Sequence, residues 1–167
     1  MSLVNGLPAH VLLVHFVVVL VPLTALAVVV CAVWPKAARR MGLMLPLLAL
    51  VTLASVPLTT SAGEWLERHV SGNALIERHA ELGDGLLPWA LGLFVLAAGV
   101  WWTTRRTPAE QTGNRSASIV RIAAAVLSVA VAAGAVVDVY RIGDSGAKAA
   151  WHDGYSKTAT GSADGDD

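Results

Sequence analysis

Four long stretches without charge divide the chain. About 20 helical residues, at 1.5 Å each, are needed to cross the roughly 30 Å of hydrocarbon in a bilayer. The first three stretches reach that length, and the fourth reaches it if it extends past Asp138 to about Tyr140. Helices of this composition lack the polar outer face that a soluble bundle needs. The pattern therefore predicts four transmembrane helices, at Val11–Trp34, Met41–Gly63, Gly85–Thr104 and Ile122–Val137.

Composition supports a membrane environment and removes several classes of function. Hydrophobic residues make up 55% of the 167 residues and charged residues only 14%, where a soluble domain carries about a quarter. The net charge is zero, so the chain lacks the excess of positive charge that is typical of nucleic-acid-binding proteins. The single cysteine, Cys31, excludes an internal disulfide framework, a CxxCH haem attachment site and a thiolate zinc cluster.

The basic residues predict how the four helices are oriented. The links at 35–41 and 104–121 carry seven basic residues and one acid, whereas the remaining polar segments carry five basic residues and eleven acids. The positive-inside rule places both links in the cytoplasm and both termini on the outer side of the membrane. The predicted fold is thus an all-α, antiparallel four-helix membrane bundle over residues 1–152, followed by a disordered polar tail at 153–167.

The two helical hairpins of this bundle resemble one another. Each first helix begins beyond a histidine, contains a proline, and ends in tryptophan followed by paired arginines; each second helix ends in a small-residue turn before a tryptophan. This similarity suggests an internal duplication. Small residues also predict close helix packing, on a seam at Gly85, Gly92 and Gly99, at Ala130 with Gly134, and on an inward stripe of Thr52, Ser55, Thr59 and Gly63.

With this topology, all five histidines fall at the outer end of the bundle. His15 stands inside an apolar helix, where an ionisable residue usually faces the bundle interior. It lies about 28 Å from Trp34 along its helix, and His79 lies about 33 Å from Trp101, so the two are at similar heights. Because the first and third helices are diagonal in a square bundle, His15 and His79 are predicted to hold one central ligand.

Other polar residues at this end leave alternatives open. His10 is rotated about 140° from His15 and would share its site only through a kink, and His69 and His152 fit solvated surface positions. Asp138 is the intramembrane acid, and Arg141 at i+3 is close enough to pair with it. Asp138 is either part of a structural ion pair or a carboxylate that orients one of the histidines.

Four segments of the chain resemble a bacterial family of four-span membrane proteins known only as a domain of unknown function. They are Gly6–Phe16, Thr60–Trp65, Glu77–Gly83 and Arg141–Ala147. The resemblance extends to about Trp151 and implies the four-span fold. Some relatives are fused to a Rieske-type iron–sulphur domain, which implies a redox role for the membrane part; this chain, with one cysteine, cannot form that cluster.

These observations favour a small membrane redox component that binds a non-covalent haem b, or a copper or zinc ion, through His15 and His79. His10, His69, Asp138 and Arg141 are the supporting or alternative residues. The alternative is a scaffold or assembly subunit without a cofactor, and a carrier with a midplane site ranks third. The sequence lacks phosphate-loop, HExxH and GxSxG motifs, so an enzyme is the weaker expectation. The predicted partners are the lipid bilayer and a redox or other membrane subunit.

Overall fold

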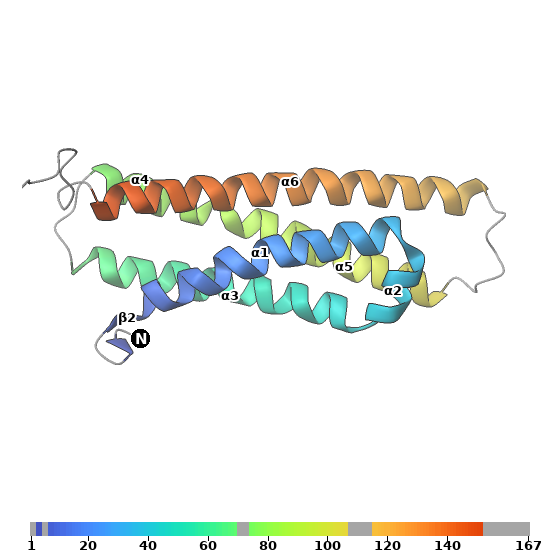
Figure 1. Cartoon of the computed structure of the whole chain (residues 1–167), viewed down its shortest axis with the longest axis horizontal. Helices are drawn as coiled ribbons and strands as arrows, with labels where there is room; N and C mark the ends of the chain where they lie inside the picture. Colours follow the sequence, from blue (N-terminus) through green and yellow to red (C-terminus); the bar gives the residue numbers. More distant parts are fainter. Residues whose placement is uncertain (1–2, 5–6, 70–73, 107–114, 152–167) are drawn as a thin grey trace, which may run out of the picture.

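The computed structural model describes residues 3–4, 7–69, 74–106 and 115–151, and within them the chain is almost entirely helical (Figure 1). Two short segments before the first helix, β1 and β2, pair antiparallel. The predicted tail at 153–167 lies outside the described residues. The elements are β1 (Leu3–Val4), β2 (Leu7–Pro8), α1 (Ala9–Val33), α2 (Pro35–Met41), α3 (Met44–Glu67), α4 (Ala74–Asp84), α5 (Leu86–Arg106) and α6 (Arg115–Trp151).

The long helices form the predicted antiparallel bundle. α1 and α5 each pack against both α3 and α6, so α1 and α5 lie on one diagonal of a square. The start of α1, α4 and the end of α6 lie at one end of the molecule, and α2 lies at the other (Figure 1). Within the described residues, four helical stretches are long and apolar enough to cross a membrane, and the protein is a membrane bundle of this class.

Three features of the helices depart from the simple four-span scheme. The first link contains a helix of its own, α2. It begins at Pro35, whose ring fixes a φ suited to a first helical turn, and ends at Met41; Gly42, with φ of +51°, follows it. The third stretch consists of α4 and α5, separated by a break at Gly85. α6 has 37 residues, roughly 55 Å, and therefore extends well beyond the hydrocarbon.

The two hairpins bury equivalent positions, which supports the predicted duplication. Leu86 of α5 follows Val17 of α1 by 69 residues, and Ser128 of α6 follows Leu45 of α3 by 83 residues. The same two offsets hold along each helix. The buried pairs are Val17/Leu86, Val21/Ala90, Thr24/Leu93, Val28/Ala97 and Cys31/Val100 in the first helices, and Leu45/Ser128, Ala49/Ala132, Thr52/Ala135, Val56/Val139, Thr59/Ile142 and Ala62/Ser145 in the second helices.

The predicted glycine seam on α5 is only partly correct. A Cβ on Gly92 would lie 3.1 Å from Val131 of α6, so this glycine does face a neighbouring helix. A Cβ on Gly99 would meet nothing within 4 Å. Gly99 therefore does not mark a helix contact.

The closest glycine contact joins α5 and α6 at Gly134. A Cβ there would lie only 2.2 Å from the Trp89 ring, so the indole packs directly on the α6 backbone. Ala130, predicted beside Gly134 in this interface, is exposed. The inward polar stripe of α3 is confirmed, since Thr52 and Thr59 are buried, and Thr52 accepts a 2.7 Å hydrogen bond from Thr24 of α1.

Candidate cofactor site

His10 lies in the first turn of α1 and packs against α3. A Cβ on Gly63 would be 3.1 Å from both Cε1 and Nδ1 of His10, so the glycine makes room for the ring. Nδ1 is 3.0 Å from the carbonyl oxygen of Thr59. A carbonyl can only accept, so Nδ1 carries a proton and donates to it; in the Nδ1–H tautomer, Nε2 is the acceptor or metal ligand.

His79 lies in α4 and packs against α6 in the same manner. A Cβ on Gly146 would be 2.9 Å from Cε1 of His79. The Ser145 hydroxyl donates to the carbonyl oxygen of Ile142 at 2.8 Å and is therefore the acceptor for Nδ1–H of His79 at 3.0 Å. His79, like His10, is therefore held through Nδ1–H.

The two histidines are equivalent members of the internal repeat and lie beside one another. His79 follows His10 by 69 residues, and Gly146 follows Gly63 by 83 residues, the offsets found in the buried core. The ring centroids are 6.2 Å apart, and the ring planes are inclined by 82°. Two imidazoles from opposite hairpins, each hydrogen-bonded through Nδ1, thus lie beside one another at one end of the bundle.

The structure brings His10, rather than His15, to His79. The side chain of His15 is exposed, and its Nδ1 donates to the carbonyl oxygen of Val11 in its own helix at 2.6 Å. Five residues separate His10 from His15, a rotation of about 140°, so only one of them can face the interior. The expectation that His15 points inward therefore does not agree with the rotation of α1.

His69 is a surface residue at the end of α3. Its ring stacks on Trp65 with centroids 4.0 Å apart, and its Nδ1 donates to the carbonyl oxygen of Trp65 at 2.7 Å. This local arrangement fits the solvated position expected for it. His152 lies outside the described residues.

Asp138 and Arg141 do not form the predicted ion pair within the described part of the chain. Arg141 is exposed, whereas Oδ2 of Asp138 is buried and has no hydrogen-bond partner among the described residues. The carboxylate faces the helix break, with Oδ2 3.7 Å from the position of a Cβ on Gly85. Ser145, and not Asp138, is the residue that orients the His79 ring.

Sequence reasoning missed Ser145 and the central place of His10. A signal for His10 exists in the spacing of the buried residues, because His10 is seven residues before Val17, and His79 is seven residues before Leu86. Both histidines thus continue the interior stripes of their helices toward the end of the bundle. On α1 nearly every neighbouring position is also apolar, so the sequence alone does not single out this stripe.

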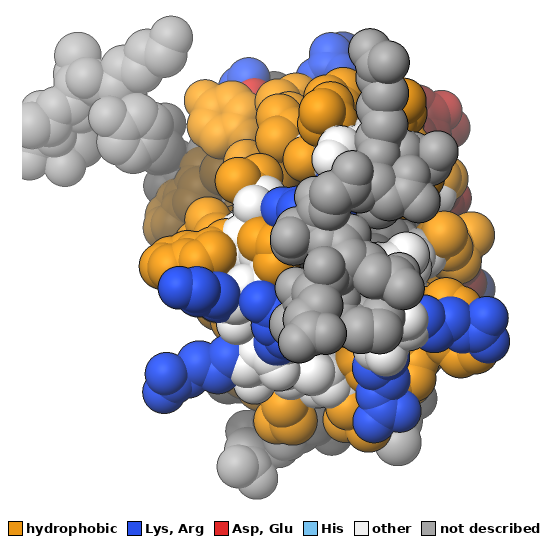
Figure 2. Space-filling view, turned by 90° about the vertical axis from the view of Figure 1, so that its right-hand side faces the viewer, with side chains coloured by type: hydrophobic (Ala, Val, Ile, Leu, Met, Phe, Trp, Pro, Cys, Tyr) orange, Lys and Arg blue, Asp and Glu red, His pale blue; other side chains and the backbone are white. Residues whose placement is uncertain are grey.

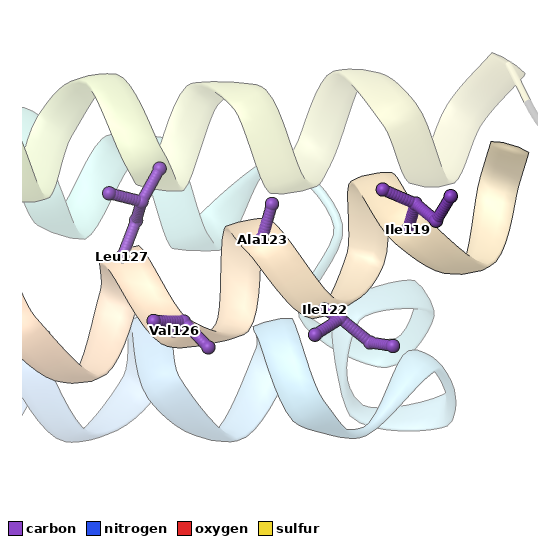
Figure 3. A pocket seen from close by; sticks show the side chains of 5 residues that line it. All are labelled: Ile119, Ile122, Ala123, Val126 and Leu127. Atoms are coloured by element: carbon purple, nitrogen blue, oxygen red, sulfur yellow. The ribbon is translucent and has the colours of Figure 1, made fainter.

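A surface groove on α6 contains neither histidine of the pair. Its lining residues are Ile119, Ile122, Ala123, Val126 and Leu127. It is lined entirely by apolar side chains (Figure 3), and no described residue of the paired-histidine site belongs to it. Within the described residues, no group of three or more histidine, cysteine or acidic side chains is placed to hold a metal ion.

Comparison with known proteins gives a family but no characterised relative. Neither the curated proteins nor the solved structures include a match to this chain. The family model described as "Predicted membrane protein (DUF2231)" matches residues 6–159, a range that contains both histidines and all four spans. The chain therefore belongs to the DUF2231 family of membrane proteins.

Proposed function

We propose that this protein is a membrane redox component in which His10 and His79 are the axial ligands of a non-covalent haem b. The observation that carries the proposal is that two imidazoles, one from each hairpin, lie side by side, with each Nδ1 hydrogen-bonded to a neighbouring helix and neither Nε2 hydrogen-bonded among the described residues. This replaces His15 by His10 in the histidine pair that the sequence suggests.

The separation of the ring centroids leaves space for one metal atom between the two imidazoles. With metal–nitrogen bonds of about 2.0–2.1 Å, two imidazoles bound through Nε2 have centroids about 6.5 Å apart when linear and about 5.3 Å apart at a tetrahedral angle. The observed 6.2 Å is close to the linear value. Axial ligation of haem iron is linear, whereas zinc is tetrahedral.

The number of protein ligands supports the same choice. A structural zinc ion takes four protein ligands and a catalytic one takes three, but the described residues offer only the two imidazoles at this point. A porphyrin supplies its own four equatorial nitrogens, so two histidines complete the coordination. Among free metal ions, a copper ion with two ligands is the one that His10 and His79 alone would hold.

The residues around the pair have definable roles. Thr59 and Ser145 fix the tautomers, and Gly63 and Gly146 allow the rings to lie close to α3 and α6. When bound, a haem with two histidine ligands supplies one-electron transfer rather than oxygen chemistry. The site lies at the end of the bundle where the chain begins, which the basic-residue count assigns to the outer face of a bacterial plasma membrane.

The test is the optical spectrum of protein expressed with ample haem and purified in mild detergent. The expected result is a reduced-minus-oxidised difference with Soret and α bands that His10→Ala and His79→Ala each abolish. His15→Ala is the matched control, since it removes an exposed imidazole from the same helix and should leave the bands unchanged.

Two results would contradict the proposal. Absence of the bands in the wild-type protein, together with no copper by elemental analysis, would favour the scaffold function, in which the histidines only join helices. Loss of the bands in His15→Ala with retention in His10→Ala would show that the other histidine is the ligand.

A further inference from the structure

The end of the bundle opposite the histidines carries a concentrated positive charge. Lys36, Arg39 and Arg40 of α2 and Arg105 and Arg106 of α5 are all exposed. No acidic residue occurs in the described part of this end, and the sequence of its two links contains a single acid, Glu110. Figure 2 views the molecule from this end and shows Lys and Arg side chains around its rim.

Packing of α2 fixes where these cations point. Ala38 is 4% exposed and belongs to a buried cluster with Val100 of α5 and Cys31 of α1. Because one face of α2 is held against the bundle in this way, its charged residues must face outward. The short helix therefore lies across the end of α5, at the level where a membrane helix meets lipid headgroups.

Two tryptophans hold the arginines of α5 in defined orientations. The Cζ atom of Arg105 is 4.8 Å from the ring centroid of Trp101, and that of Arg106 is 4.0 Å from the ring centroid of Trp102. A guanidinium stacked on an indole keeps its N–H groups free at the edge. The free N–H groups of a planar guanidinium are suited to bind the oxygens of a phosphate.

An unpartnered donor lies beside Arg105. Nε1 of Trp101 is buried and has no hydrogen-bond acceptor among the described residues. Gly92 faces α6, and Trp101 follows it by nine residues, or two and a half turns, so Trp101 lies on the opposite flank of α5. α2 contacts α5, and its Ala38 shares a buried cluster with Val100, the residue before Trp101.

From these observations we propose that the α2 end of the bundle binds the headgroup of an anionic phospholipid. The indole N–H of Trp101 donates to a phosphate or ester oxygen, the Arg105 guanidinium pairs with the phosphate, and the α2 cations contribute attraction over a longer range. A zwitterionic headgroup offers the same phosphate but brings its own cation, which the five basic side chains repel. The site therefore selects for lipids with net negative charge.

The experiment measures lipid retained by the full-length protein after purification from vesicles of phosphatidylcholine, with or without phosphatidylglycerol, by native mass spectrometry. The expected result is preferential retention of phosphatidylglycerol that weakens as salt rises. Trp101→Phe removes the donor and Arg105→Gln removes the cation. Each should lower the retention of phosphatidylglycerol by about fivefold, the value of one hydrogen bond of about 1 kcal/mol.

Matched controls separate this site from general attraction to the membrane. Trp102→Phe keeps an aromatic ring beneath Arg106, and Arg78→Gln removes an exposed charge on α4 at the opposite end; both should retain the wild-type preference. Arg105 is exposed, so its substitution tests the site even if Trp101→Phe fails to fold. Equal retention of the two lipids, equal effects of the two tryptophan variants, or full displacement by soluble glycerol phosphate would each overturn the proposal.

Discussion

Replacing Gly134 with alanine tests whether Trp89 holds α5 against α6. The added Cβ would lie 2.2 Å from Cζ3, 2.3 Å from Cη2 and 2.8 Å from Cε3 of the Trp89 ring. Ordinary contacts of a Cβ begin at about 3.4 Å, so the indole or the helix must move by about 1.2 Å. An indole is rigid, and three of its atoms are in the way, so a small rotation of one end cannot relieve the overlap.

The cost can be compared with the gain expected from helix propensity. Overpacking of this kind costs about 1–3 kcal/mol, and a gap of 0.5–1 Å between helices forfeits a quarter to a half of the dispersion energy of the atoms involved. Alanine in place of glycine in a helix contributes up to about 1 kcal/mol in the opposite direction. We expect Gly134→Ala to lose about 1–2 kcal/mol of unfolding free energy.

The assay is unfolding by SDS in mixed micelles, followed by circular dichroism so that changes at tryptophan do not affect the signal. Gly143→Ala, also on α6, is the control, because a Cβ there would meet nothing within 4 Å. It should be neutral or stabilising. A double variant with Trp89→Leu should recover stability, since contacting residues are coupled. Equal stability of Gly134→Ala and Gly143→Ala would refute the packing argument.

Three further predictions concern the two histidine positions, the polar core and the topology. Gly63→Ala and Gly146→Ala should each lower haem content without unfolding the bundle, because the new Cβ would be 3.1 Å and 2.9 Å from the imidazole ring; the ratio of haem absorbance to protein measures this. Unfolding free energies of Thr24→Val, Thr52→Val and the double variant should give a coupling energy of about 0.6 kcal/mol, the average for polar pairs between membrane helices. Protease added to intact cells should cleave after Trp151, and a tail cut only in inverted vesicles would reverse the predicted orientation.

The sequence by itself determined the architecture of this protein. Charge-free stretches of membrane-spanning length predict four helices because lipid excludes charge and because only hydrogen-bonded helices can cross it as single segments. The short links make neighbouring helices antiparallel, and this places His10, His15, His69 and His79 at one end. The predicted similarity of the hairpins also reflects a real equivalence of buried positions.

Only the tertiary structure decided which histidine faces the interior. On α1, apolar residues surround the helix on all sides, so the sequence contains no amphipathic pattern that fixes its rotation. The rotation is set by close packing against the other helices, which buries Val17 and Val21 and with them turns His10 inward and His15 outward. The pairing of His10 with Gly63, and of His79 with Gly146, depends on contacts between residues more than 50 positions apart, which no local pattern can specify.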